Sequence, residues 1–531
     1  MNRLRYFAGA ATGFREIVRA PRLESAETLI RAHLTRRHEN FLELVRRVIF
    51  ANPAHPYRQM FAIVGCSYDD LAAAVRRDGL EAALASLHRS GVYLTHDEFK
   101  LKTPIVRGNR TIAADSGSFR NPLATGRLVG FSSGSRSTGT AVGVSTRARV
   151  YREAYDKLAI DEFDLTRRRY VLLKPTLPTL DGLMNLARSA RLGCALDTWF
   201  SPVVASADSL HYRLATYGLL AMGRLYGLRL PFPTHLGSND YSPVVRTIAK
   251  RRGEGLPVLV RTYASGAVRV AAAARDMGVA IDGTLFIVGG ETLTDGKRAT
   301  IEAAGAEVFP HYAITELGSI GYACRQMTNG NSVHVNTDSL AVLTHRRAAP
   351  LSGTEVESLL FTALQPHAPF VLINAEMDDG GTLHQATCDC RFARVGLTTV
   401  IRDVASFGKL TGHGVTLVGT DVIRILERTL PARFGGSATD YQLVEHDGAA
   451  QARMTLRVSP RVPVSALSDV KALFLAELRT YQGGQIASRL WQHAEALDVT
   501  HEEPVASGAR GKILPLHLLG SGARSEAVRG S

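Results

Sequence analysis

Cysteine and long apolar runs are both scarce in this chain of 531 residues. The five cysteines are an odd and sparse set that argues against a disulfide framework and suits a reducing compartment. No apolar run approaches the roughly 18 residues of a membrane-spanning helix, so none is expected. The first residues, Met1–Phe14, are basic, but their apolar patch is too short and too interrupted for a signal peptide. These absences predict a cytoplasmic protein.

Aromatic residues are also sparse, at 7% of the chain, and no basic run is interleaved with them. A nucleic-acid groove is therefore not predicted. The formal charge of +14 favours anionic partners, small molecules as readily as polymers. Hydrophobic residues make up 45% of the sequence, which is enough to fill the cores of two or three domains at this length.

The most distinctive segment is Leu128–Ser145, which reads LVGFSSGSRSTGTAVGVS. Serine, threonine and glycine fill its middle, and their hydroxyls and unhindered backbone N–H groups can converge on a phosphate. Val142 and Val144 alternate with smaller residues, which predicts the second strand of a β-hairpin. A polar hairpin turn that binds nothing has the same composition.

Two other motifs match this segment less well. Gly130, Ser132 and Gly134 fit the GxSxG pattern of a serine hydrolase, but that elbow needs a helix directly after the serine. The Walker phosphate loop needs a lysine after its last glycine, and none follows Gly134 or Gly139. A serine hydrolase that uses Ser132 is kept as the less favoured alternative.

The order of elements after Tyr170 indicates an α/β fold with a mainly parallel sheet covered on both faces. Short β-rich runs alternate there with helical ones. The expected strands include Tyr170–Leu173, Val258–Val260 and Leu285–Val288, and the expected helices include Ser242–Arg251 and Ala267–Met277. Apolar residues at helical spacing predict one more helix, over Leu29–Phe50, near the start of the chain.

Beyond about Gly408 the elements become shorter and resemble a small α+β domain. A strand at Val415–Val418, a helix from Asp421, a hairpin turn at Asp447-Gly448 and a helix at Leu467–Tyr481 are expected. The predicted domains are therefore a large one over residues 1–408, with βα-type sheets packed by helices, and a small one over residues 409–520. Residues 521–531 are expected to be a disordered tail.

Four ordered motifs resemble those of adenylate-forming enzymes, and within that superfamily those of phenylacetate-CoA ligases and their relatives. They are the hairpin loop, GGE at Gly289–Glu291, HYAITE at His311–Glu316 and GK at Gly511–Lys512. The resemblance runs from about His38 to about Leu514. It implies a ligase with a mobile small domain that uses ATP to activate a carboxylic acid as acyl-AMP, releasing pyrophosphate. The acyl group then passes to the thiol of coenzyme A (CoA) or of a carrier protein, or to an amine.

The resemblance also assigns residues to the nucleotide. The loop residues that would cover the ATP phosphates are Ser132, Ser133, Gly134, Ser135 and Thr140. Arg136 would supply the charge of a lysine that the family usually has in this loop and this chain lacks. The turn residues Gly289, Gly290 and Glu291 would lie near the adenine, with Tyr312 packed close to it, although glycines at such a place also form ordinary strand-to-loop turns.

Asp378 is the acid nearest to the family's ribose-binding aspartate, and it stands one place out of register. The run Asp378-Asp379-Gly380-Gly381 can equally be an ordinary turn.

Glu316 stands where the family holds Mg²⁺, with Thr315 beside it reaching phosphate. A carboxylate suits this hard cation, which offsets charge on the leaving pyrophosphate. The Thr-Glu pair could instead cap a helix that continues from Leu317. Lys512 would bridge the substrate carboxylate and the ribose 5′ oxygen. The alternative for Lys512 is a solvated surface lysine, the usual place for this residue.

Four further residues make up a Cys₃His set that suits structural Zn²⁺ in tetrahedral coordination: Cys324, His334, Cys388 and Cys390. Phenylacetate-CoA ligase relatives show a similar pattern, although the run CDCRFAR lacks the glycine of their CPCGR-like run. Buried, reduced cysteines that act as small hydrophobic residues are the alternative.

A degenerate relative that binds nucleotide without catalysis also fits this sequence. This alternative is favoured by the missing loop lysine. It is also favoured by the domain junction, which is about three residues shorter than in the family.

Overall fold

The computed structural model describes most of the chain. The described ranges are 3–124, 128–131, 141–144, 146–177, 179–202, 210–237, 240–328, 330–348, 355–406, 411–412, 415–416, 419–446, 453–480, 497–507 and 512–519. The predicted loop residues Ser132, Ser133, Gly134, Ser135, Arg136 and Thr140 lie outside these ranges, as do Gly408, the turn at Asp447-Gly448, Gly511 and the tail 521–531.

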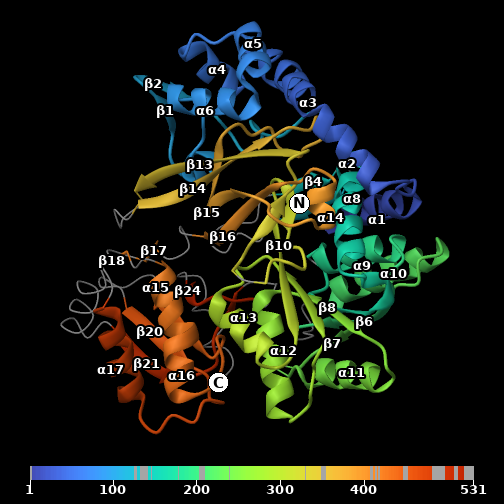
Figure 1. Cartoon of the computed structure of the whole chain (residues 1–531), viewed down its shortest axis with the longest axis vertical. Coiled ribbons are helices and arrows are strands. Elements are labelled where there is room, and N and C mark those ends of the chain that lie inside the picture. Colours follow the sequence, from blue (N-terminus) through green and yellow to red (C-terminus); the bar gives the residue numbers. More distant parts are fainter. Residues whose placement is uncertain are drawn as a thin grey trace.

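A twelve-stranded mixed sheet is the largest sheet among the described residues (Figure 1). One half is parallel, in the order β7 (Pro233–His235), β6 (Ala195–Ser201), β5 (Arg169–Leu173), β8 (Val258–Thr262), β9 (Leu285–Gly289) and β10 (Glu307–Ile314). The other half is antiparallel, in the order β11 (Gly318–Tyr322), β12 (Val333–Val335), β16 (Thr399–Ser406), β15 (Ala375–Gln385), β14 (Glu355–Ala363) and β13 (Leu340–Ala348). The predicted α/β class with a helix-packed sheet is confirmed. The expectation of a mainly parallel sheet is wrong, because the strands after β10 return directly and pair antiparallel, without helical crossovers.

Both faces of the parallel half are covered, as the apolar runs predicted. Tyr170 and Leu172 of β5 pack into a core with helices of one face, whereas Val171 and Leu173 pack into a core on the other. The helices of the first face include α8 (Thr146–Glu162), α9 (Asp181–Arg191) and α10 (Leu210–Leu225), and those of the second include α11 (Ser242–Gly253), α12 (Ala264–Asp276) and α13 (Asp295–Glu302). Successive residues of a strand point to opposite faces, so a strand buried on both sides must be apolar throughout.

The N-terminal part contributes helices to both halves of the sheet. The first two, α1 (Arg3–Arg19) and α2 (Ala26–Thr35), pack in the core that contains α8, α9 and α10. The antiparallel half is covered by α3 (Arg37–Leu44), the π-helix η1 (Val45–Phe50), α4 (Pro56–Ile63), α5 (Tyr68–Asp78), α6 (Leu80–Ser90) and α7 (His96–Phe99). The single helix predicted over Leu29–Phe50 is therefore interrupted, because Arg36 leaves the helical conformation between α2 and α3. A short hairpin of β1 (Ile105–Arg107) and β2 (Arg110–Ile112) follows.

The predicted hairpin around the Ser/Gly loop is confirmed in its two strands. β3 (Leu128–Phe131) pairs antiparallel with β4 (Ala141–Val144). Because the chain after the loop forms a strand, it lacks the helix that a nucleophile elbow at Ser132 would require there.

The C-terminal residues form a unit with its own apolar core. Its sheet has the order β21 (Leu497–His501), β20 (Arg453–Val458), β19 (Tyr441–His446) and β24 (Leu516–Leu519). Helical segments α15 (Gly419–Arg424), the π-helix η5 (Ile425–Thr429), α16 (Leu430–Phe434) and α17 (Leu467–Leu478) pack around it, with the short pairs β17–β18 (Thr411–Gly412, Val415–Thr416) and β22–β23 (Ala506–Ser507, Lys512–Ile513). This unit lies beside α12 and α13 (Figure 1).

Within the described ranges, none of the helices combines the length and apolarity needed to cross a membrane.

Candidate active site and candidate metal centre

The GGE motif forms a turn at the carboxyl end of β9. A Cβ atom on Gly289 would lie 2.6 Å from the backbone oxygen of His311 on β10, which is too close for any side chain. Gly290 has a φ of 78°, a left-handed conformation that favours glycine. A Cβ atom on Gly290 would also lie 3.2 Å from the Nζ atom of Lys512. Glycine is needed here because β10 and Lys512 occupy the adjoining space.

Glu291 holds this turn against the start of α12. Its carboxylate accepts hydrogen bonds from the backbone N–H and the hydroxyl of Ser265, at 2.9 and 2.8 Å. A carboxylate at a helix N-terminus is favoured by the helix dipole. The Ser265 Oγ atom lies 3.5 Å from the backbone N of Ile513, so Glu291 and Ser265 together stabilise the strand that carries Lys512.

Lys512 is buried, with 9% of its surface exposed, so the alternative of a solvated surface lysine is wrong. Its ammonium donates to the backbone oxygen of Gly290 and lies 5.0 Å from the ring centroid of Tyr263. The ammonium of Lys174 lies 3.7 Å from the same centroid. The structure therefore brings the lysine of the C-terminal GK motif to the GGE turn.

Thr315 and Glu316 lie in the tight turn between β10 and β11, with Thr315 exposed and Glu316 buried. The alternative of a helix running on from Leu317 is wrong, because strand β11 begins at Gly318 and pairs back onto β10. Capping therefore does not account for this pair. The Glu316 carboxylate instead accepts from the ammonium of Lys100, at 2.6 Å.

Tyr312 lies on β10, and its hydroxyl donates to Asp379, with 2.6 Å between the oxygen atoms. Burial and the Asp379 carboxylate raise the pKa of the Tyr312 hydroxyl well above its ordinary value. Asp378, the predicted ribose ligand, precedes it on β15 with a left-handed φ of 68°, and its backbone oxygen accepts from the Ser406 hydroxyl. The acid beside Tyr312 is thus Asp379, one place further along.

A buried polar cluster underlies the same end of the sheet. Asp156 of α8 forms an ion pair with Arg188, at 2.8 Å. Burial raises its pKa, but the arginines around it outweigh that effect and hold the pKa well below the usual range. His311 stacks on Tyr322, and its Nε2 atom forms a hydrogen bond of 3.1 Å with the Ser319 hydroxyl. Burial lowers the pKa of His311 well below the ordinary value. This histidine is therefore neutral at physiological pH.

The candidate residues thus gather where β9 and β10 end. Ligands of α/β sheets bind at the carboxyl ends of parallel strands. Lys100, Tyr263, Ser265 and Asp379 each contact one of the predicted residues. They were missed from the sequence because none of them stands in a recognisable motif.

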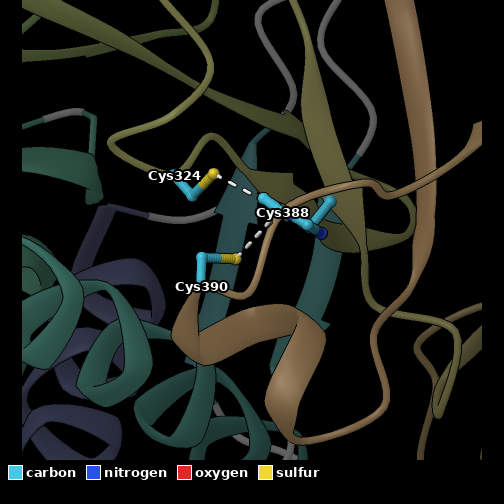
Figure 2. A group of neighbouring side chains, drawn as sticks. Cys324, Cys388 and Cys390 are labelled. Carbon is cyan, nitrogen blue, oxygen red and sulfur yellow. Dashed lines mark hydrogen bonds between the residues drawn. The ribbon is translucent and has the colours of Figure 1, made fainter.

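The predicted Cys₃His set comes together in space, as its three cysteines in Figure 2 show. Cys324 follows β11, His334 lies on β12, and Cys388 and Cys390 precede α14 (Arg391–Arg394). Their candidate ligand atoms all lie within 4.8 Å of one another. The three cysteines are also reduced, and Cys324 and Cys390 are buried, so zinc binding stays a prediction beside the alternative of small hydrophobic residues.

The ligand atoms have the spacing of a tetrahedral zinc site. The Sγ atom of Cys388 lies 3.9 Å from that of Cys324 and 3.5 Å from that of Cys390. The Nε2 atom of His334 lies 3.3 and 3.2 Å from the sulfurs of Cys388 and Cys390. Bonds of about 2.3 Å to sulfur and about 2.0 Å to nitrogen separate tetrahedral ligands by about 3.5 to 3.8 Å.

His334 also has the orientation that a zinc ligand needs. Its Nδ1 atom lies 2.9 Å from the backbone oxygen of Leu397, and such a bond leaves Nε2 free for a metal. The residues present therefore fit zinc.

No protein-family model and no curated protein matches this chain. Among solved structures, it is similar to 2-hydroxyisobutyryl-CoA ligase in the post-adenylation state, bound to an acyl-AMP. The TM-score is 0.52 and the identity 14%, and the match covers 93% of this chain and 91% of the ligase. The chain therefore has a fold similar to that of this ligase, and the resemblance found in the motifs is confirmed at the level of the fold.

Two more distant neighbours are the same ligase with acyl-AMP and CoA in the thioesterification state, and the O-succinylbenzoate CoA synthetase of Bacillus subtilis with ATP and magnesium. The first has a TM-score of 0.44 at 15% identity, covering 96% of this chain and 94% of the ligase. The second has a TM-score of 0.34 at 12% identity, covering 79% of this chain and 86% of the synthetase.

Proposed function

We propose that this chain is an ATP-dependent ligase that activates a carboxylic acid as an acyl-adenylate. The observation that carries the proposal is the position of Lys512, which is buried and bonded to Gly290 in a chain with the adenylate-forming fold. Burying an ammonium group costs free energy unless it has an anionic or polar partner. At the end of β9 and β10, the partners of the Lys512 ammonium would be the substrate carboxylate and a phosphate of ATP.

In the first reaction a carboxylate oxygen of the acid forms a bond to the α-phosphorus of ATP while the bond to pyrophosphate breaks. Lys512 would stabilise the negative charge that is shared by the carboxylate and the phosphate oxygens. Tyr312 would pack against the adenine near Gly289 and Gly290. The ribose hydroxyls would meet Asp378 or the neighbouring Asp379, which already accepts from Tyr312.

Glu316 would hold Mg²⁺, with Thr315 toward the phosphates. Its buried carboxylate is already paired with a cation, Lys100, so the position stabilises positive charge and fits a hard metal ion. When bound, the ion would offset charge on the leaving pyrophosphate. The loop residues Ser132, Ser133, Gly134, Ser135, Arg136 and Thr140 would cover the phosphates through hydroxyls, backbone N–H groups and the Arg136 guanidinium.

In the second reaction a thiol would attack the acyl carbonyl carbon and AMP would leave. We assign the acceptor to CoA or a carrier-protein thiol, with an amine as the other option, and we place the chain nearest to phenylacetate-CoA ligases. The C-terminal unit, residues 409–520, would rotate against residues 1–408 between the two reactions. Its contacts near Lys512 include hydrogen bonds, such as that between Ser265 and Ile513, which such a rotation would exchange for others.

The Cys₃His cluster would hold one structural Zn²⁺ that joins β11, β12 and the segment before α14. Metal binding to such a site contributes directly to folding. Thiolate ligands require reduced cysteines, and the five cysteines form no disulfide, which suits the cytoplasm.

The test is an ATP–pyrophosphate exchange assay across aryl, acyl and amino acids, with hydroxylamine to trap the adenylate. Exchange that depends on one class of acid supports the proposal. The altered loop, which lacks the family's lysine, favours a second candidate, a relative that binds ATP and forms no adenylate. Saturable ATP binding with no exchange for any acid would establish that candidate. Labelling of Ser132 by a fluorophosphonate, with no response to ATP, would instead identify a serine hydrolase.

A further inference from the structure

The carboxylate of Glu316, which is proposed to bind Mg²⁺, already pairs with the ammonium of Lys100. The Nζ atom of Lys100 lies 2.6 Å from Oε1 of Glu316, with 24% of the lysine side chain exposed and 6% of the glutamate. The two residues are 216 positions apart in the sequence. Charge-assisted contacts of this length are among the stronger hydrogen bonds in proteins.

The backbone of Lys100 is held firmly behind this contact. Lys100 ends α7, whose first turn has a capping box formed by Thr95 and Glu98. Glu98 is also bound by the buried guanidinium of Arg107, at 2.7 Å. The anchor is therefore rigid, whereas the lysine side chain reaches across to the β10–β11 turn and is the part that can move.

An ammonium on Oε1 of Glu316 and a divalent cation on the same carboxylate repel each other at such short range. A metal ion at Glu316 therefore competes with Lys100 and favours its departure. The freed ammonium stays tethered beside the site, where the strongest anion is the phosphate chain of the nucleotide. The loop over residues 132–140 contains no lysine and one arginine, Arg136, so the Lys100 ammonium would add a second positive charge for that phosphate chain.

We propose that Lys100 is a phosphate-binding residue that exchanges partners. It pairs with Glu316 until a divalent metal takes that carboxylate, and it then binds a phosphate oxygen of the nucleotide. The inference rests on the proposed function, because it assumes that Glu316 faces a metal–nucleotide complex. It predicts that loss of the Lys100 side chain strengthens metal binding and weakens nucleotide binding.

The experiment measures two affinities in Lys100→Ala and in the length-conserving Lys100→Gln. The first is for Mn²⁺ without nucleotide, from the free-ion signal in electron paramagnetic resonance. The second is for ATP with saturating Mg²⁺, from calorimetry. Removing the competing ammonium should tighten Mn²⁺ binding several-fold, whereas removing the phosphate contact should weaken ATP binding by about tenfold.

Lys102→Ala is the matched control. Lys102 is two positions away, and its ammonium pairs with the exposed Asp97 at 3.1 Å, so neither affinity should change. Weaker or unchanged Mn²⁺ binding in both Lys100 variants would overturn the inference, and so would unchanged ATP affinity. If the wild-type chain binds neither Mn²⁺ nor ATP, the proposed function itself fails. Thermal unfolding of each variant shows whether a weakened affinity reflects lost folding.

Discussion

The ammonium of Lys297 lies 3.4 Å from the carboxylate of Glu427, and the two side chains are only 3% and 1% exposed. Lys297 belongs to α13 beside the central sheet, and Glu427 belongs to η5 of the C-terminal unit. The hydroxyl of Thr294 also donates to Glu427. This buried pair therefore joins the two parts of the chain on the side of α13 that faces the C-terminal unit.

Glu427→Ala should destabilise the protein strongly. The substitution leaves the Lys297 ammonium buried without its carboxylate, which typically costs about 3 to 5 kcal/mol. Urea denaturation followed by circular dichroism measures the loss. Glu39→Ala is the control, since Glu39 pairs with Arg36 on the surface and such pairs contribute under about 1 kcal/mol. An equally small loss in both variants would show that the pair contributes no more than a surface contact.

Lys512→Ala should abolish most adenylate formation. Without the ammonium, the charge shared by the carboxylate and the α-phosphate loses its stabilisation, and ATP–pyrophosphate exchange should fall by about 100-fold or more. Thiol transfer from a supplied acyl-adenylate should fall much less. Lys250→Ala, which alters an exposed lysine of α11, serves as the control. Undiminished exchange in Lys512→Ala would remove the assignment.

Metal analysis of the purified protein should find about one zinc per chain. Cys388→Ser should lose the metal and lower the unfolding temperature, because one coordination centre joins segments that are distant in sequence. Cys66→Ser should keep the zinc, since Cys66 lies outside the cluster. Well under one zinc per chain in the wild type, under reducing conditions, would contradict the site.

Acid should destabilise the N-terminal helices through His55. Burial lowers the pKa of this histidine to about 4, and its Nδ1 atom accepts the Tyr57 N–H that caps α4. In the unfolded chain His55 binds a proton at about pH 6.5, whereas in the folded chain it binds one only near pH 4. The resulting loss, up to roughly 3 kcal/mol, should develop between those pH values.

His55→Asn tests this pH dependence. Asparagine is a good N-cap but does not titrate, so the slope of unfolding free energy against pH should flatten in this range, whatever the change at neutral pH. The same slope in variant and wild type would assign the acid sensitivity to other groups.

Local pattern was enough to predict most elements of this fold. Strands such as Leu285–Val288 are apolar throughout because both of their faces are buried. Alternation at Val142 and Val144 predicted the hairpin that β3 and β4 form. The break at Arg36 was not predicted, because apolar residues at helical spacing continue on both sides of this residue, which alone leaves the helical conformation.

The site divides in the same way. Short motifs indicated where unusual local structure lies, since Gly289 and Gly290 form the turn at β9 and the Cys₃His set converges, whereas their roles toward nucleotide and zinc stay predictions. The register on β15 was not decided by the sequence, because neighbouring residues of a strand face opposite sides and one position separates Asp378 from Asp379.

The sequence by itself determined which chemical groups are present and which local structures carry them: the turn glycines, the buried strands, the thiols and the lysine of the last motif. Only the tertiary structure decided their partners. Lys100 with Glu316, Lys297 with Glu427 and Ser265 with Glu291 are pairs between separate elements. No local preference encodes such pairs, because each forms only when the sheet and its helices have brought distant segments within a few ångströms.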